Sequence, residues 1–148
     1  MPGKDLDIRL LLLDVDGVLT DGRIIYGASG TEAKAFDVKD GHGLKLIQRA
    51  GISVGIITGR ESEAVKRRAE ELGVEYLYQG AKNKLKPFNE ILERSGLNEK
   101  NVAYVGDDLV DLPILRKVGF AATVADAVDE VKSCVAYVST RPGGRGAV

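Results

Sequence analysis

The chain has 148 residues, with 21 Lys or Arg and 22 Asp or Glu, so its formal net charge is −1. This length predicts one domain over residues 1–148, and the near-neutral charge argues against a dedicated nucleic-acid or anionic-membrane binder. One cysteine excludes an intrachain disulfide or a cysteine-based zinc cage, and one histidine excludes paired-histidine catalysis. Chemistry therefore depends on carboxylates, Lys, Arg, Ser, Thr and backbone amides.

The apolar run Leu10–Leu13 is far shorter than the roughly 18 residues that span a bilayer. Mixed charges precede it, whereas a secretory signal begins with a basic segment. We therefore expect a cytoplasmic protein.

In chain order, the first expected strand is Ile8–Leu13. The segment after it departs from the alternation of strands and helices that the rest of the chain follows. Arg23–Tyr26, a turn at Gly27–Gly30 and then Ala33–Val38 predict a β-hairpin within about residues 22–39. Because Arg23–Tyr26 would leave apolar side chains exposed in a monomer, the hairpin favours pairing with other chains.

Strands and helices alternate after the hairpin. Three apolar stripes of helical spacing end at Gly51, Gly73 and Gly96, the residue type that commonly follows a helix. The further strands are expected at Ser53–Ile57, Glu75–Tyr78, Val102–Val105, Phe120–Val124 and Ala136–Val138. Most are unbroken apolar runs, which are typical of parallel strands covered on both faces. The pattern predicts a doubly wound α/β sheet, followed by a flexible Gly-rich tail at about 141–148.

Polar residues lie in the segments that follow four of the expected strands. They are Asp14 and Asp16; Thr58, Gly59 and Arg60; Lys82, Lys84 and Lys86; and Asp107, Asp108 and Asp111. Because ligands of an open parallel sheet bind outside the carboxyl ends of its strands, these side chains should converge at one edge.

Carboxylates gathered in one place repel each other unless a cation lies among them. Oxygen ligands without His or Cys suit Mg²⁺, which often binds a substrate phosphate as well. A nearby Lys and Thr with free backbone amides would then hold phosphate oxygens.

This ordered set of motifs resembles the haloacid dehalogenase (HAD) superfamily. Asp14–Thr20 (DVDGVLT) is similar to its first motif, Thr58 to its second, Lys84 to its third, and GDD from Gly106 with Asp111 to its fourth. The resemblance covers nearly the whole chain. It implies a three-layer α/β/α Rossmann-like parallel sheet with a small inserted hairpin and no large cap domain.

More narrowly, the chain resembles the capless family of 3-deoxy-D-manno-octulosonate 8-phosphate (KDO 8-phosphate) phosphatases. The segments that carry this are DVDGVLTDG from Asp14, KDGHGL from Lys39, ITGR from Ile57, YVGDD from Tyr104 and the tail GGRGAV. The resemblance implies a phosphoric monoester hydrolase acting on a sugar phosphate in lipopolysaccharide precursor synthesis. It also implies a homotetramer assembled through the hairpins, in which a neighbour's tail can reach the active site.

The resemblance also implies a two-step phosphoryl transfer. Asp14 would attack phosphorus and form an aspartyl-phosphate. Asp16 would protonate the leaving alkoxide and then deprotonate the hydrolytic water. Mg²⁺ would be held by the carboxylates of Asp14 and Asp107 and by the backbone carbonyl of Asp16.

Other residues of the motifs would bind or support. Thr58 and Lys84 would hold the phosphoryl oxygens, Asp111 would orient Lys84, and Asp108 would support the metal shell. The remaining substrate-binding candidates are Gly59, Arg60 and Arg145. Arg60 is either a surface residue or a ligand for a substrate carboxylate. Arg145 is either a solvated tail residue or a substrate-binding residue.

Ordinary structural interpretations stay open beside these roles. An Asp or Thr after a strand often caps a helix or turn, and Asp108 and Asp111 could simply begin a helix. Lys84 competes with Lys82 and Lys86 as a solvated lysine. His42 is more often structural than catalytic, and Cys134 is expected to be inert.

Three alternative functions remain. The substrate could be a related nine-carbon 2-keto sugar acid 9-phosphate, and the chain could be a catalytically weak oligomerisation module. A phosphoacceptor signalling domain of the receiver type uses similar residues, but its phosphorylated Asp normally follows a middle strand, whereas Asp14 follows the first.

Overall fold

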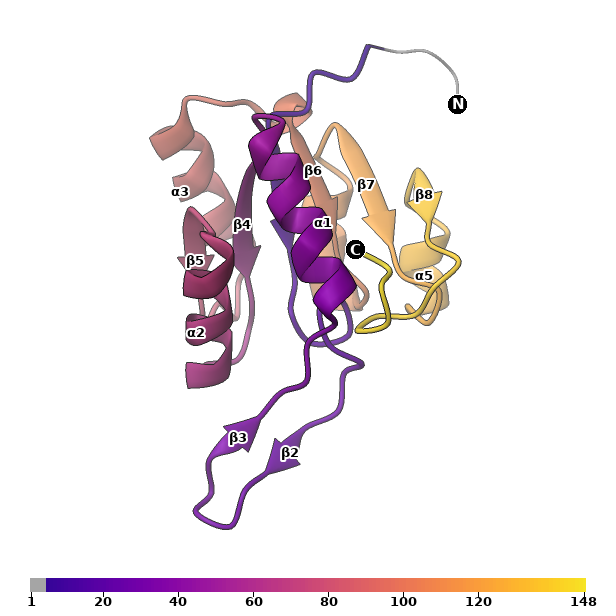
Figure 1. Ribbon diagram of the computed structural model, residues 1–148. Helices are drawn as coiled ribbons and strands as arrows, with labels where there is room; N and C mark the ends of the chain where they lie inside the picture. The colour runs from indigo at the N-terminus through magenta and orange to yellow at the C-terminus, as the bar shows by residue number, and fades with distance from the viewer. Residues whose placement is uncertain (1–4) are drawn as a thin grey trace.

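A six-stranded parallel sheet forms the centre of the computed structural model, which describes residues 5–148 (Figure 1). Its strands, in the spatial order β5-β4-β1-β6-β7-β8, are Tyr76–Tyr78, Ser53–Ile57, Leu10–Leu13, Val102–Val105, Phe120–Thr123 and Tyr137–Val138. Every strand of this sheet that the sequence predicts is present, with ends shifted by no more than two residues. The chain starts in the middle of the sheet and extends it first to one side of β1 and then to the other, which confirms the doubly wound class.

Helices cover both faces of this sheet. On one face lie α1 (Val38–Arg49) and α2 (Glu63–Leu72), which stand in front of the strands in Figure 1. On the other lie α3 (Leu85–Ser95) and the short α4 (Leu112–Leu115) and α5 (Asp129–Lys132), with 3₁₀ turns at Glu99–Asn101 and Leu109–Asp111. No helix within residues 5–148 is long and apolar enough to cross a membrane.

Residues at the helix ends explain where the helices begin and stop. Asp37 caps α1, because its carboxylate accepts the N–H of Lys39 at 2.7 Å. Gly73 and Gly96 adopt the left-handed conformation at the ends of α2 and α3, as their positions in the sequence predict.

The buried core is divided by the sheet. Leu10 and Leu12 of β1 pack with Phe88 of α3 and with α4 on one face of the sheet, whereas Leu13 packs with α1 and α2 on the other. All four side chains are fully buried, and each such side chain contributes roughly 1.5–3 kcal/mol through removal from water. This packing fixes β1, and therefore the position of the acidic loop that follows it.

Between β1 and α1 the chain forms a hairpin of β2 (Ile25–Tyr26) and β3 (Glu32–Ala33) that projects beyond the carboxyl edge of the sheet (Figure 1). Its turn is closed by the N–H of Gly27, which donates to the Thr31 carbonyl at 2.7 Å. The prediction that the second arm extends to Val38 is wrong. The paired part ends at Ala33, and Val38 is already the first residue of α1, which Asp37 caps.

The C-terminal tail packs against the loop after β1, which differs from the flexible tail that its composition predicts. The N–H of Gly143 donates to the Asp126 carboxylate at 2.9 Å, and the N–H of Gly144 donates to the Val18 carbonyl at 3.1 Å. A side chain on Gly143 would meet the Gly17 carbonyl oxygen at 1.8 Å. The glycines therefore serve close approach of two backbones here, a use of glycine that composition cannot distinguish from flexibility.

Candidate active site

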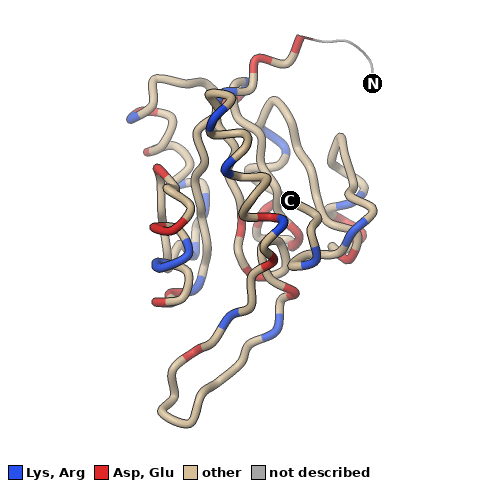
Figure 2. The backbone as a smooth tube through the Cα atoms, in the orientation of Figure 1, with Lys and Arg blue, Asp and Glu red and all other residues tan. Residues whose placement is uncertain are grey.

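The register of the central strands brings the predicted site residues together. Leu13 of β1 lies level with Ile56 of β4 and Val105 of β6, so these strands end at the same edge. A cavity of about 390 Å³ opens there, lined by Asp14, Asp16, Thr58, Gly59, Arg60, Ala81, Lys82, Lys84, Asp107, Asp108 and Val110. Figure 2 shows acidic residues gathered around these carboxyl ends. The convergence that strand order predicted is therefore present.

The loop after β1 is held by its own backbone. The Val15 carbonyl accepts the N–H groups of Val18, Leu19 and Thr20 at 2.9–3.1 Å. Gly17 has a φ of 86°, and a side chain there would lie 1.9 Å from Asp107 Oδ2. Glycine at this position thus provides both the turn and the room for Asp107.

A buried ion pair lies beneath the cavity. Lys84 Nζ is 2.7 Å from Asp111 Oδ1 and 3.1 Å from Asp14 Oδ1. Asp111 is fully buried; its Oδ1 also accepts the Tyr104 hydroxyl at 2.6 Å, and its Oδ2 accepts the N–H groups of residues 107–108 at 3.1 and 3.2 Å. Both Asp111 oxygens are thus engaged by the protein, and this carboxylate holds the lysine in place.

Burial and crowding perturb the ionisation of the acidic groups. Burial, and then repulsion from Asp14, raises the pKa of Asp107 to about 8. Burial, and then repulsion from Asp111, raises the pKa of Asp14 to about 6. Burial alone would lower the pKa of Lys84, but attraction to Asp14 and Asp111 outweighs it and raises that pKa. The single ammonium group of Lys84 therefore does not neutralise the negative charge of the neighbouring carboxylates.

The arrangement fits a divalent cation. Asp14, Asp107 and Asp111 each place one oxygen within 4.8 Å of the others. Within residues 5–148, Asp107 Oδ1 is buried and has no hydrogen-bond partner. Since Asp111 is fully engaged, Asp14 and Asp107 carry the oxygens suited to a hard cation such as Mg²⁺.

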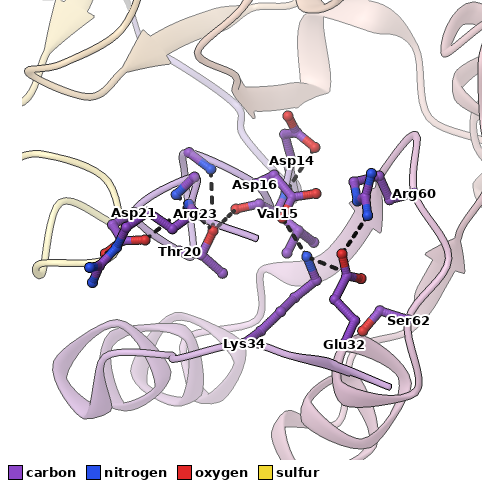
Figure 3. Close-up of polar contacts among 12 residues, drawn as sticks. Asp14, Val15, Asp16, Thr20, Asp21, Arg23, Glu32, Lys34, Arg60 and Ser62 are labelled. Atoms are coloured by element: carbon purple, nitrogen blue, oxygen red, sulfur yellow. Dashed lines mark hydrogen bonds and ion pairs between the residues drawn. The ribbon is translucent and has the colours of Figure 1, made fainter. Parts of the chain in front are cut away.

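Asp16 faces a different neighbour. Its Oδ1 lies 2.5 Å from Nζ of Lys34, a residue of the hairpin segment (Figure 3). Glu32 of β3 reaches the guanidinium of Arg60 at 2.5 Å. Sequence reasoning missed Glu32 and Lys34. Their spacing of two residues in an extended segment, which places both side chains on one face, was the signal that could have found them.

The other predicted residues differ in placement. Thr58 is buried at the cavity, and Arg60 is partly exposed at its rim. Asp108 caps the Leu109–Asp111 turn, in agreement with its ordinary structural interpretation. Arg145 is exposed and does not line the cavity of its own chain. His42 is exposed on α1, and Cys134 is a partly buried free thiol.

The chain is similar in sequence to proteins of known family. A family model described as haloacid dehalogenase-like hydrolase matches residues 41–119. The chain is 50% identical over 145 residues to 3-deoxy-D-manno-octulosonate 8-phosphate phosphatase KdsC of Escherichia coli K12, a match covering 98% of this chain and 77% of that protein.

Solved structures of similar proteins superpose closely. The crystal structure of 3-deoxy-D-manno-octulosonate 8-phosphate phosphatase from Yersinia pestis has a TM-score of 0.94 at 44% identity, covering 96% of this chain and 77% of that one. The enzyme of that name from Moraxella catarrhalis, in complex with a magnesium ion, a phosphate ion and KDO, also has a TM-score of 0.94, at 43% identity, covering 97% and 82%.

Proposed function

The chain belongs to the haloacid dehalogenase-like hydrolases and is a phosphoric monoester hydrolase, and from this premise we propose that it hydrolyses KDO 8-phosphate to KDO and inorganic phosphate. The observation that carries the proposal is the 50% identity to a phosphatase of that name over 98% of the chain. The cavity supports it, because carboxylates, a buried lysine and a buried threonine meet at one edge of the sheet.

Asp14 is the proposed nucleophile. In the first step its carboxylate oxygen forms a bond to phosphorus while the bond from phosphorus to the sugar oxygen breaks, which leaves an aspartyl-phosphate. Val15 N–H donates to Asp14 Oδ1 at 2.7 Å, and Lys84 lies 3.1 Å from the same oxygen, so the carboxylate is held before the reaction. Lys84 and Thr58 border the place where phosphoryl oxygens would lie, and both can stabilise their charge.

Asp16 is the proposed general acid and base. It gives its proton to the departing sugar oxygen in the first step. In the second step it takes a proton from water, whose oxygen bonds to phosphorus as the bond to Asp14 breaks. Asp16 lies at the same cavity as Asp14, two residues along the chain, as this exchange requires.

Mg²⁺ is the proposed cofactor, held by the carboxylates of Asp14 and Asp107 and by the backbone carbonyl of Asp16. When bound, it would neutralise carboxylate and phosphate charge that Lys84 alone leaves uncompensated. Asp111 and Asp108 contribute by holding Lys84 and the loop after β6.

Arg60 is the proposed ligand for the carboxylate of a 2-keto sugar acid. Its guanidinium lies at the rim of the cavity and already accommodates one carboxylate, that of Glu32. Gly59 beside it also lines the cavity and is a further proposed substrate contact. Arg145 would contribute from a neighbouring subunit, since it lies outside the cavity of its own chain.

The test is phosphate release from a panel of sugar phosphates, with and without Mg²⁺. We expect magnesium-dependent turnover, fastest with KDO 8-phosphate and slower with a nine-carbon 2-keto acid 9-phosphate. Asp14→Asn is the matched control and should be inactive. Preference for the nine-carbon substrate would replace the proposed substrate, and a wild-type protein that releases no phosphate from any of them would contradict the assignment.

The proposal includes assembly as a homotetramer in the cytoplasm, serving lipopolysaccharide precursor synthesis. Ile24, Ile25 and Tyr26 on the hairpin are 44%, 45% and 68% exposed, an apolar surface suited to contact with other chains. Sedimentation velocity should show a tetramer for the wild type and smaller species for Ile25→Ser/Tyr26→Ser. A monomeric wild type at micromolar concentration would contradict this assembly.

A further inference from the structure

Lys34 is an unusual residue because its side chain is buried although it belongs to a hairpin whose turn is exposed. Its side chain is only 1% exposed, although Ala33 and Ala35 on either side are exposed. Burying an ammonium is costly unless it is paired with opposite charge. The pairing is present: Lys34 Nζ lies 2.5 Å from Asp16 Oδ1 and 3.8 Å from Glu32 Oε2 (Figure 3).

Asp16 depends on this contact for its orientation. Among residues 5–148, Lys34 is the only group that forms a hydrogen bond or ion pair with the Asp16 carboxylate. The Asp14 carboxylate, in contrast, is held by a backbone N–H and a second lysine. A carboxylate that must face the departing oxygen and then a water needs a fixed rotamer, and here the hairpin supplies the group that selects it.

Glu32 extends the contact to the substrate-recognition side. Its Oε2 faces Lys34, and its Oε1 lies 2.5 Å from Arg60. These contacts form a series of side chains with alternating charge, which runs from Asp16 through Lys34 and Glu32 to Arg60. The β2–β3 pairing itself involves only two residues of each strand, so these ion pairs join the hairpin to the cavity.

We propose that Lys34 is a positioning residue for Asp16, and that Glu32 ties it to Arg60, so that the hairpin couples the acid–base carboxylate to substrate recognition. This inference rests on the acid–base role given to Asp16 in the proposed function. Lys34 itself does not exchange protons with substrate; it holds the carboxylate that does.

The test compares Lys34→Met with two substrates whose leaving groups differ. The alkoxide of a sugar phosphate needs protonation as it departs, whereas 4-nitrophenolate needs little. For KDO 8-phosphate we expect kcat to fall roughly 100-fold, the lower range for loss of general acid–base catalysis, with KM changed less than about threefold. With 4-nitrophenyl phosphate we expect a burst of nitrophenolate at near wild-type rate followed by slow turnover, because only the second step then requires Asp16.

Controls separate positioning from general damage. Lys34→Arg keeps the charge and should recover kcat to within about tenfold of the wild type. Lys39→Met removes a lysine of the neighbouring segment whose side chain is 68% exposed. It should leave kcat for both substrates unchanged. If Lys34→Met does not fold, Lys34→Gln, which keeps a hydrogen-bond donor, takes its place with the same expected pattern.

Two results would overturn the inference. One is a folded Lys34→Met or Lys34→Gln protein with kcat within about twofold of the wild type on both substrates. The other is an equal loss of burst rate and turnover, which indicates a damaged site as a whole. The 4-nitrophenyl phosphate measurement keeps the two proposals apart, because it tests Lys34 even if KDO 8-phosphate is not the substrate.

Discussion

Replacement of Asp107 by Asn should stabilise the metal-free protein at alkaline pH. Asp107 has a buried oxygen with no hydrogen-bond partner among residues 5–148, and it lies near Asp14, so its ionised form is unfavourable in the folded state. Its folded pKa of about 8 lies above the unfolded value of 3.8, so the folded protein binds the proton more tightly. Stability therefore falls as pH rises from about 4 to about 8, and the penalty is complete above pH 8.

The size of the effect follows from the same shift. A change from 3.8 to about 8 corresponds to at most about 6 kcal/mol. Because Asp107 is only partly shielded from water, screening reduces this, and we expect about 2–3 kcal/mol at pH 8 and about 1 kcal/mol at pH 5. For a chain of 148 residues, the gain at pH 8 should raise the Tm of Asp107→Asn by roughly 5–10 °C.

The measurement is thermal unfolding of wild type and Asp107→Asn at pH 5 and pH 8, in EDTA and in excess Mg²⁺. Mg²⁺ should raise the Tm of the wild type at pH 8 and have a much smaller effect on the variant, because binding to the folded state alone stabilises it. Glu93→Gln, at an exposed carboxylate of α3 on a different element from Asp107, is the control and should change little. A variant less stable than the wild type in EDTA at pH 8, or an equal gain at both pH values, would refute the reasoning.

Three further predictions concern the site and the tail. Asp14→Asn should lower kcat by roughly four orders of magnitude or more, and acid-quenched samples should lose the phosphorylated species in intact-mass spectra; persistent turnover would exclude Asp14 as the nucleophile. Asp111→Asn should destabilise the protein by about 3–5 kcal/mol in urea unfolding, since it leaves buried Lys84 without its nearer partner; an unchanged urea midpoint would show that the ion pair contributes no stability. Gly143→Ala should cost about 1–3 kcal/mol, because its side chain meets the Gly17 carbonyl, and should speed tryptic cleavage of the tail; tail cleavage at the wild-type rate would contradict the packing.

Local sequence patterns were enough to predict the sheet and much of the site. Unbroken apolar runs identify buried parallel strands, and glycines after apolar stripes mark the ends of α2 and α3. In such a sheet the carboxyl ends of neighbouring strands share one edge, so residues that follow strands must meet. Asp14, Thr58 and Asp107 could therefore be brought together without coordinates.

Contacts between segments distant in sequence were not predictable in this way. From the sequence, Lys34 is an ordinary exposed hairpin residue, whereas in the structure it lies 2.5 Å from Asp16. The glycine-rich tail is likewise expected to be flexible, whereas in the structure it packs against the loop at Gly17. Arg145 likewise resembles a site residue in sequence, yet it lies outside the cavity of its own chain.

By itself, the sequence determined the class of sheet, its strand ends and the chemical groups that gather there, because hydrophobic periodicity and strand polarity are local properties. The tertiary structure alone decided which of those groups touch. Asp111 accepts hydrogen bonds from Lys84, Tyr104 and backbone N–H groups, whereas one buried oxygen of Asp107 has no hydrogen-bond partner in the part of the chain that the structure describes. That difference arises from distances between separate segments, which depend on how the whole core packs.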